Sequence, residues 1–517
     1  MVTFSGRALY ALAFLQALVV GSPLPPTDVP SYFKREPWTR RSISTIKCQR
    51  ELGATLSAGA AIFGPESPSF SNTTHRWNTA APPEIELVVQ AGAESDVSKI
   101  VKYCNDNSIK FLAVNRGHGW SSALGKFKGI QIDMKKLTGI TIHKDTETAT
   151  FQGGVWGSLV MNTLWDAGYL TPTGAHACVG FMGPALGGGH GRLEGLHGLV
   201  ADNMLHLNVV LADGSTIAVN STSNADLFWA MKGAGHNFGI VTSLKVKIYP
   251  ALHPTWHWHN YIWAEDKLER VFTELNKIQD NGKAPVLLGS SFGSIALNKS
   301  ISTTKPVLSW QFAYYGSAKD GEEVLRPFNE IEAIWNGQGD LPYPEIVIPQ
   351  LTSLNECASG AYAFSGLLTQ TWNITTERRN YNKFVKNAAA FPELAATAQL
   401  FYEGYATAGM SAVPSDSTAY AHRDEYHLPL FMGVVPKGQS MRRGQAWAKE
   451  HLDEWTAGQP TRKLATYINY SVGAEYESLQ SVYGYEPWRL ERLRKLKAKY
   501  DPKNRFRYYV PIIPKDR

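Results

Sequence analysis

The chain is poor in cysteine and has no long apolar run beyond its first residues. Only four of its 517 residues are cysteine, and no C-x-x-C pair or His/Cys cluster is present, which argues against a disulfide scaffold and against a metal site. The apolar run from Ala8 to Val20 is shorter than the about 20 residues that a membrane-spanning helix needs. It follows Arg7 and precedes Gly21. We therefore predict a secretory signal peptide over residues 1–21 and a secreted or secretory-pathway protein without a membrane span.

The chain also lacks a strong excess of charge of one sign. Its net charge is +6, and the basic residues are scattered except between Arg489 and Lys499. Leu490, Leu493 and Leu496 fall on one helical face of that stretch, which predicts an amphipathic helix and no nucleic-acid-binding surface. The hydrophobic content of 44%, with 15 tryptophans, is ample for a core and leaves aromatic surface for a planar organic ligand.

Glycine is concentrated in two segments between Pro82 and Pro250. The first, AVNRGHGWSSALGKFKGIQIDM, follows the pattern strand, loop, strand, with the loop beginning near Gly117. The second, VGFMGPALGGGHGRLEGLHGL, holds eight glycines between Gly180 and Gly198. Glycine lets a backbone approach a pyrophosphate closely, and successive turn N–H groups can bind anionic oxygens. Both segments are therefore predicted to contact a ligand.

Two common nucleotide sites are excluded by the surrounding pattern. Neither segment has the strand, G-x-G-x-x-G, helix and acidic residue of a Rossmann unit, and neither ends in the Lys-Ser/Thr of a P-loop. A third run, MKGAGHNFGIVTSLKVKIYP, ends in an alternating strand that would close a domain. Any one run fits glycine-rich turns in an ordinary α/β protein, but three in this order and spacing favour a ligand cradle.

Taken together, these runs resemble the FAD-binding half of berberine-bridge-enzyme-like FAD-linked oxidoreductases, within the PCMH-type (vanillyl-alcohol-oxidase) superfamily and of the fungal secondary-metabolism type. The likeness resumes in YINYSVGAEY and RLERLRKLKAKYDPKNRF near the C-terminus. It implies an α+β fold: a PCMH-type FAD-binding domain of two α/β subdomains, plus a substrate domain with an antiparallel sheet covered by helices. The implied boundaries are a lead-in over 22–80, an FAD domain over 81–251, a substrate domain over 252–455, and a segment returning to the FAD domain over 456–517.

The resemblance implies a covalent cofactor. In this family the histidine of the first glycine loop bonds to the 8α-methyl carbon of the flavin, so we expect FAD attached through His118. Many relatives add a cysteine link at the position that His176 holds here, while Cys178 lies two residues further on. We expect a single link, with His176 beside the flavin, and leave a second bond from Cys178 open. The remaining FAD contacts that the resemblance implies are Asn115, Arg116, Gly117, Gly119, Ser121, Val179, Gly180, Gly183, Gly187, Gly188, Gly189, Asn237, Gly239, Ile240, Val241 and Asn469.

The catalytic base is not evident from the sequence. Relatives of the plant type carry a Glu or Tyr on a substrate-domain strand, at a position that falls near Leu430 or Phe431 here. Tyr470, Tyr402 and His422 are our candidates, with Tyr470 preferred for its place in the YINYS motif. A tyrosine base would need its pKa of about 10 lowered by a cation or by a flavin-edge hydrogen bond. Tyr405 and Tyr420 are further titratable groups, and His190 and His197 could line the pocket or serve as ordinary buried polar groups.

The resemblance also suggests a bridge between Cys48 and Cys104, whereas no partner is evident for Cys178 or Cys357. Sequons that agree with the secretory route begin at Asn72, Asn220, Asn298 and Asn373. Another begins at Asn469, which we expect to be unglycosylated because its motif faces the flavin in this family.

The implied reaction is oxidation of a small hydrophobic natural-product intermediate, as an alcohol, an amine or an oxidative ring closure. Hydride would pass to flavin N5, and molecular oxygen would be the acceptor and give hydrogen peroxide. Val179 stands where relatives that admit oxygen tend to have a small residue and those that exclude it a larger one, which favours an oxidase. Two alternatives stay open: a carbohydrate oxidase, which would present carboxylates and amides to sugar hydroxyls, and a redox-neutral cyclase or isomerase on the same scaffold. We expect a monomer.

Overall fold

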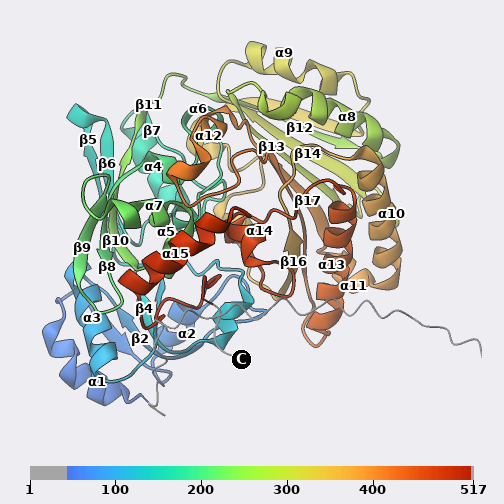
Figure 1. The fold of residues 1–517 in the computed structure, drawn as a ribbon. Helices are drawn as coiled ribbons and strands as arrows, with labels where there is room; N and C mark the ends of the chain where they lie inside the picture. Colours follow the sequence, from blue (N-terminus) through green and yellow to red (C-terminus); the bar gives the residue numbers. More distant parts are fainter. Residues whose placement is uncertain (1–42, 514–517) are drawn as a thin grey trace, which may run out of the picture.

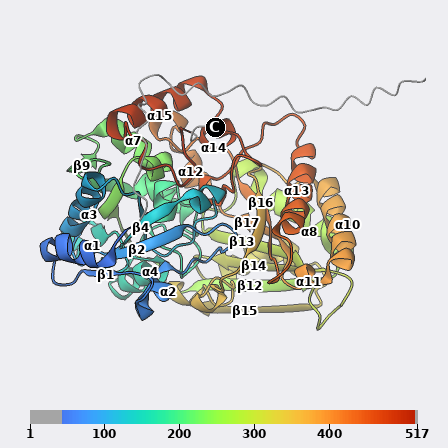
Figure 2. The same cartoon turned by 90° about the horizontal axis from the view of Figure 1, so that it is seen from below.

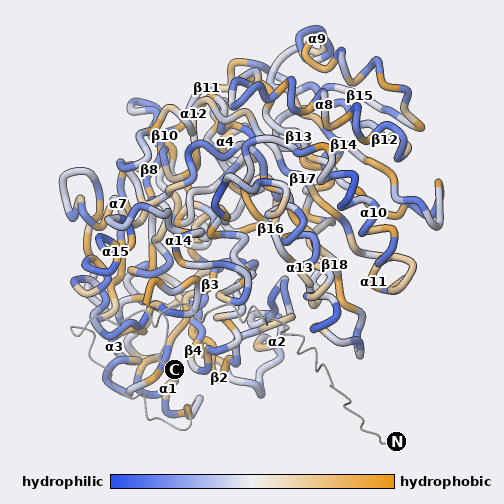
Figure 3. Tube along the Cα trace, turned by 45° about the vertical axis from the view of Figure 1, so that its right-hand side comes forward, coloured by the Kyte–Doolittle hydropathy of each residue, from blue (hydrophilic) through white to orange (hydrophobic). Residues whose placement is uncertain are grey.

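The structure is a computed structural model that describes residues 43–513, and it consists of an α/β part and a part built on one large sheet (Figure 1). Seen from below, the two parts lie side by side, and helix α15 (Pro487–Tyr500) crosses the α/β part (Figure 2). The predicted signal peptide and residues 22–42 of the lead-in lie outside the described residues. Within residues 43–513 no helix has the length and apolar character to cross a membrane. Apolar stretches along the trace are short and alternate with polar ones (Figure 3).

The first α/β unit holds the first glycine loop at the end of a parallel strand. Strands β2 (Glu84–Gln90), β4 (Lys128–Asp133) and β3 (Phe111–Val114) run parallel, and β1 (Ala61–Phe63) adds to the edge in the antiparallel sense. Helix α3 (Glu94–Asp106) connects β2 to β3 and buries one apolar stripe against the sheet. The loop between β3 and β4 is the first glycine segment. Helices α1 (Thr45–Glu51) and α2 (Pro68–Thr74) precede this sheet.

The second α/β unit is an antiparallel sheet with helices on one side. Its strand order is β5-β6-β10-β8-β9. The strands are β5 (Ile140–His143), β6 (Thr148–Gln152), β8 (Met204–Val210), β9 (Thr216–Asn220) and β10 (Ile240–Lys247). A two-stranded sheet joins β7 (Tyr169–Leu170) to β11 (Tyr249–Pro250). The helices are α4 (Gly157–Asp166), α5 (Met182–Leu186), α6 (Glu194–His197) and α7 (Ala225–Ala234). The second glycine segment runs through α5 and α6 and lies over the core of this unit.

The large sheet is antiparallel, with the order β15-β12-β14-β13-β17-β18-β16. Its strands are β12 (Trp256–Trp263), β13 (Leu288–Ala296), β14 (Val307–Tyr314), β15 (Trp335–Leu341), β16 (Tyr362–Gly366), β17 (Gln399–Gly404) and β18 (His427–Val434). The helices of this part are α8 (Leu268–Gln279), α9 (Ala318–Asn329), α10 (Ile374–Ala390), α11 (Pro392–Ala395), α12 (Ala408–Ser411) and α13 (Met441–Ala457). Helices α8, α9, α10 and α13 cover one face of the sheet (Figure 1). The other face turns toward the glycine segments.

Successive side chains on a strand point to opposite faces. On β17, Leu400 and Tyr402 belong to the helix-covered core, whereas Phe401 packs on the α/β side. Glu403 shares the face of Phe401. This alternation decides which residues of β17 can reach a ligand held by the glycine segments.

The chain returns to the α/β part after α13, through α14 (Leu479–Tyr483) and α15. Leu490, Leu493 and Leu496 are buried against the core of the second α/β unit, so the predicted apolar face of this helix is confirmed. Lys497 is fully buried and donates to Asp501 Oδ2 at 2.6 Å and to Asn237 O at 2.6 Å. The architecture is the α+β arrangement that the sequence predicts.

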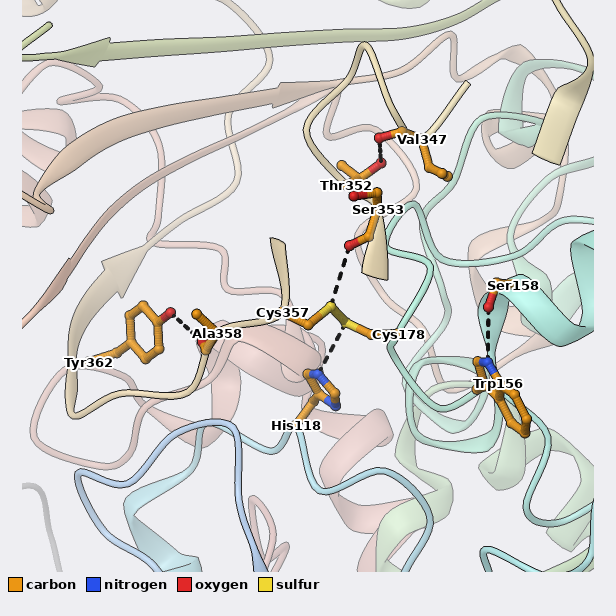
Figure 4. The surroundings of a disulfide bond; sticks show 10 residues. All are labelled: His118, Trp156, Ser158, Cys178, Val347, Thr352, Ser353, Cys357, Ala358 and Tyr362. Carbon is orange, nitrogen blue, oxygen red and sulfur yellow. Dashed lines mark hydrogen bonds between the residues drawn. A yellow bond between two sulfur atoms is a disulfide. The ribbon is translucent and has the colours of Figure 1, made fainter. Parts of the chain in front are cut away.

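The disulfide of the structure differs from the predicted one. Cys178 is bonded to Cys357, 179 residues away (Figure 4). Cys48 and Cys104 are thiols buried in the core of the first α/β unit. Burial raises the pKa of the Cys104 thiol. The prediction of a Cys48–Cys104 bridge is therefore wrong for this structure. Cys178 and Cys357 meet because the segment after β15 folds back onto the second glycine segment, where Ala177 N donates to the carbonyl of residue 352 at 2.9 Å.

Candidate active site

His118 extends from the first glycine loop toward the disulfide (Figure 4). Its Nε2 is 3.4 Å from Cys178 Sγ, and its Nδ1 is buried and has no hydrogen-bond partner within residues 43–513. Burial, followed by the charges of His176 and Arg116, lowers the pKa of His118 to about 4. The ring is therefore neutral near pH 7, and Nδ1 can carry a lone pair that is free to bond to carbon.

The residues around His118 fit a polar ligand. Asn115 donates its amide to the carbonyls of Gly153 and Val155, at 3.0 and 2.8 Å, and leaves its buried Oδ1 without a partner in the described chain. A Cβ on Gly180 would lie 2.8 Å from Asn115 Cγ, so only glycine allows the two segments to approach this closely. Together with His118 Nδ1, the Asn115 oxygen is a buried polar atom that a cofactor with several polar atoms can satisfy.

The other predicted residues of the first loop surround the same place. Gly117 adopts φ 77°, which favours glycine, and the guanidinium of Arg116 lies 4.5 Å from the ring centre of Trp156. A Cβ on Gly119 would lie 3.2 Å from the ring of Tyr509, and Ser121 is buried, with its hydroxyl accepting from Ala123 N at 3.3 Å. Contacts of Arg116, Gly119 and Ser121 with neighbouring residues therefore hold the loop in place.

The second glycine segment approaches the C-terminal YINYS motif. Cβ atoms on Gly187 and Gly188 would lie 2.4 Å from Asn469 Oδ1 and 2.7 Å from the Tyr420 ring, whereas nothing lies within 4 Å of such an atom on Gly183. Gly188 and Gly189 have φ 111° and 86°. The open side at Gly183 is where this segment can accept a ligand.

Two further predicted residues flank the disulfide. Val179 O accepts from Gly157 N at 2.9 Å and so joins the segment to the start of α4. Burial, and then the charge of Arg192, lowers the pKa of His176 to about 4. His176 is thus near His118 and neutral at pH 7.

The side chain of Asn237 contacts the C-terminal segment. Its amide donates to Tyr483 Oη at 3.0 Å and to Val510 O at 3.3 Å, and its Oδ1 accepts from Ile512 N at 3.1 Å. Both amide hydrogens are therefore used to anchor the C-terminal segment. The Asn237 side chain is thus engaged within the protein, and its contact with FAD stays a prediction.

Its predicted neighbours also form part of the structural framework. A Cβ on Gly239 would lie 2.4 Å from Val209, and Ile240 and Val241 open β10, where they pair with Val210 and Val209.

A buried carboxylate faces the glycine segments from β17. Glu403 is 5% exposed and accepts hydrogen bonds from Tyr470, at 2.6 Å, and from Tyr405. Burial raises the pKa of Glu403, although these two hydrogen bonds act in the opposite direction. Burial, and then the charge of Glu403, raises the pKa of Tyr470 well above 10. Tyr470 is thus the proton donor of the pair, and Glu403 is the group that can take up a proton.

This finding revises the expectation for Tyr470. A tyrosine base needs a cation beside it, but its neighbour is an anion. Tyr470 therefore suits a relay, which accepts a proton on its oxygen while it passes its own proton to Glu403.

A second polar chain lies beside the first. His190 Nδ1 is 2.8 Å from Glu194 Oε2, and its Nε2 is 2.7 Å from Tyr420 Oη. The His190 ring also stacks on Tyr405 at 6.1 Å, and the backbone N–H of His190 donates to Tyr467 Oη at 3.3 Å. His190 therefore connects the second glycine segment to the surroundings of Glu403.

Apolar side chains form a wall next to Tyr470. Phe364, Leu430 and Val472 are its buried members. The partly buried side chains packed against them are Trp120, Phe401, Met432, Tyr470 and Tyr476. The ring of Phe364 lies 3.9 Å from that of Trp120 and 5.8 Å from that of Tyr470, measured between ring centres. We refer to this cluster as the aromatic wall.

Two of the catalytic candidates lie elsewhere. Tyr402 is on the helix-covered face of β17 and donates to Glu377 at 2.8 Å, because one residue along a strand reverses the side-chain direction. His422 is buried, and its Nε2 is 3.1 Å from the carbonyl of Val482 in α14. In the structure these two side chains hold structural elements together, and Tyr402 lies on the opposite face of β17 from Glu403.

Sequence reasoning missed Glu403. The position predicted for the base lies on β18, where Leu430 joins the aromatic wall and Phe431 points to the opposite core. Glu403 is on the adjacent strand, paired with residue 428. The signal that could have revealed it is the alternation F-Y-E-G-Y, which places a carboxylate on the face of Phe401.

Comparisons with known proteins agree with this geometry. The family model described as FAD binding domain matches residues 85–220, and the one described as berberine and berberine like matches residues 466–513. The chain is 54% identical over 507 residues to the FAD-linked oxidoreductase iacH of Pestalotiopsis fici, which covers 98% of this chain and 97% of that protein.

Solved structures share the fold. A 6-hydroxy-D-nicotine oxidase from Arthrobacter nicotinovorans superposes with a TM-score of 0.75 at 23% identity, over 89% of this chain and 99% of that one. The glucooligosaccharide oxidase of Acremonium strictum, described with a 6-S-cysteinyl, 8α-N1-histidyl FAD, has a TM-score of 0.72 at 21% identity, over 92% and 100%. At these identities the likeness shows the fold alone.

Proposed function

Because the chain belongs to the berberine-bridge-enzyme-like FAD-linked oxidoreductases, we propose that it oxidises a small hydrophobic molecule and that Glu403 and Tyr470 remove the proton. The cofactor is FAD and the activity is that of an oxidoreductase. The substrate class, the bond oxidised and the residue roles are the proposed part. The observation that carries them is the buried Glu403–Tyr470 pair next to the aromatic wall.

His118 is proposed to hold the cofactor covalently through Nδ1, the buried atom without a partner. Asn115 Oδ1 and the open side of the second glycine segment at Gly183 would complete the cradle. Cys178 is bonded to Cys357 and so is not a thiolate, which supports a single link. Bound FAD supplies the hydride acceptor, and we propose molecular oxygen as the final acceptor, with hydrogen peroxide as product.

The proton step follows from the hydrogen bonds at Glu403. A substrate O–H or N–H that reaches Tyr470 Oη gives its proton to that oxygen as Tyr470 passes its own proton to Glu403 Oε2, 2.6 Å away. The hydride leaves from the adjacent carbon toward the cofactor. Tyr405 holds the other oxygen of Glu403, so the carboxylate keeps one orientation. Burial excludes water that could replace it as base.

The aromatic wall favours a hydrophobic substrate. Phe364, Leu430 and Val472 offer no hydrogen bonds to sugar hydroxyls, and Trp120 adds a flat apolar surface. A carbohydrate oxidase would need carboxylates and amides at this place. We therefore propose an alcohol, amine or ring-closing oxidation of a natural-product intermediate.

The compartment and the domain limits are also proposed. A disulfide between Cys178 and Cys357 suits an oxidising, secretory environment, and Asn72 is exposed on α2, as a glycan site should be. Asn469 donates both amide hydrogens, to Pro184 O and Tyr467 Oη, which supports our expectation that it is unglycosylated.

All strands of the large sheet lie within 252–455, which supports those limits for the substrate domain.

The test is anaerobic mixing of the purified flavoprotein with a panel of aromatic alcohols, cyclic amines and oligosaccharides. We expect the flavin absorbance to fade with one of the first two classes, and peroxide to appear when air is admitted. Fading with the sugars alone would replace the substrate proposal by the carbohydrate alternative. If a panel member is converted to product in the absence of air while the flavin absorbance stays unchanged, the chemistry is redox-neutral.

A further inference from the structure

Two histidines on β12 meet a glutamate from α9. Helix α9 lies on the face of the large sheet that the helices cover (Figure 1). His257 and His259 are two residues apart on the strand, so their side chains share that face. Glu322 Oε1 lies 2.7 Å from His257 Nε2 and 2.8 Å from His259 Nδ1. These three atoms all lie within 4.8 Å of one another.

A second set of side chains fixes the orientation of these three. Asp340 on β15 lies with its Oδ1 2.8 Å from His257 Nδ1, and Asn329 donates to Glu322 Oε2 at 2.8 Å. Metal-bound histidines usually donate their other ring N–H to a carboxylate, which sets the tautomer and strengthens the ligand nitrogen. His257, with Asp340 behind it and Glu322 in front, has this arrangement.

The burial and the proton placement also favour a cation. His257 and His259 are only 2% and 3% exposed, so their ring nitrogens are shielded from water. Glu322 Oε1 faces both imidazole rings. Without a metal ion, each ring would have to donate an N–H hydrogen bond to this one oxygen. A divalent ion in that place would accept one lone pair from each ring and one from the carboxylate.

We propose that His257, His259 and Glu322 form a binding site for a divalent transition metal ion, with zinc as the preferred ion. Two imidazoles and one carboxylate are a ligand set that suits zinc and disfavours calcium and magnesium, which take oxygen ligands. The side chain of Glu322 is 27% exposed, which leaves an entry route and a place for a water ligand. The sequence analysis predicted no metal site: H-W-H is visible on the strand, but the third ligand lies 63 residues further along the chain.

This site would be structural. It ties α9 to the strands β12 and β15 at one edge of the large sheet, whereas Glu403 lies on β17, near the opposite edge and on the other face. The bound ion should therefore stabilise the substrate part without changing the rate of flavin reduction.

The experiment uses the flavin-loaded protein after treatment with a chelator. Titration with zinc chloride, followed by calorimetry, should show one equivalent bound and a rise in melting temperature. Cobalt chloride should give the visible absorption bands of a tetrahedral site. The variants His259→Ala and Glu322→Ala should each weaken zinc binding by about tenfold or more and lose the cobalt bands. The matched control is Glu323→Ala, which removes an exposed carboxylate from the same helix and should bind as the wild type does.

Absence of zinc binding, or binding that both variants retain, would overturn the proposal and leave the cluster as a charged hydrogen-bond network. Glu322 is partly exposed on α9, so Glu322→Ala should fold even if the His259 variant does not. Flavin content and circular dichroism of each variant show whether a loss of binding reflects loss of the fold.

Discussion

Replacement of Glu403 by glutamine tests the proposed proton path most directly. The amide keeps the shape of the side chain and one acceptor for Tyr470 or Tyr405, but it cannot take up the proton. General bases contribute about 10² to 10⁴ in rate, and the 5% exposure of Glu403 leaves little room for a substitute water. We therefore expect flavin reduction by substrate to slow by about 100-fold or more, equivalent to about 3 kcal/mol in the barrier.

The pH dependence gives a second signature. Burial raises the pKa of Glu403, and the base acts only when it is deprotonated, so the reduction rate of the wild type should rise with pH through that pKa and then level off. The Glu403→Gln enzyme should lack this rise. Anaerobic stopped-flow measurement of flavin absorbance across pH provides both quantities.

The control for this experiment is Glu377→Gln. Glu377 is equally buried and accepts a hydrogen bond from Tyr402, but it lies on the helix-covered side of β17. Its replacement should leave the reduction rate within about twofold of the wild type, since it touches no part of the proposed site. Reduction at the wild-type rate by Glu403→Gln, with the same rise against pH, would refute the proposed role of the carboxylate.

Three further outcomes are expected. His118→Ala should release its flavin on acid denaturation whereas Cys178→Ser should retain it, as mass analysis of the precipitate will show; release by the second variant would contradict the single link. Tyr402→Phe should reduce its flavin at the wild-type rate, and a marked loss would return Tyr402 to the site. Burial raises the pKa of Glu377 from 4.5 to about 7, so the folded state holds a proton there that the unfolded state releases, and stability falls as pH rises between these values. Melting curves of Glu377→Gln should show a smaller fall than those of the wild type across that range; an unchanged fall would mean that Glu377 titrates normally.

The sequence predicted the parts of this protein that depend on local pattern. The glycine runs, the histidine of the first loop and the leucine face of α15 follow from residue type and spacing, and the structure brings the loops together around His118. What it did not predict depends on contacts between distant segments. Glu403 needs Tyr470, 67 residues away, and Cys178 needs Cys357, 179 residues away.

The contacts of the Asn237 side chain also depend on a distant segment. The motif around it suggested a ligand contact, but its amide is occupied by Tyr483 and Val510 of the C-terminal segment, which a local pattern does not reveal. Strand alternation alone could have separated Tyr402 from Glu403, because they are adjacent residues of one strand and must face opposite ways.

The return of the chain to the α/β part has a consequence for how the protein matures. Strand β17 supplies Glu403, but the hydroxyl that we propose connects it to substrate belongs to Tyr470, in the C-terminal segment. In the same segment, Lys497 of α15 donates to the carbonyl of Asn237. During synthesis the strands of the large sheet and both glycine segments are therefore made before Tyr470 is. The core of the second α/β unit also includes Leu490, Leu493 and Leu496 of α15, so a chain truncated before Tyr470 would lack both the proposed relay hydroxyl and part of that core.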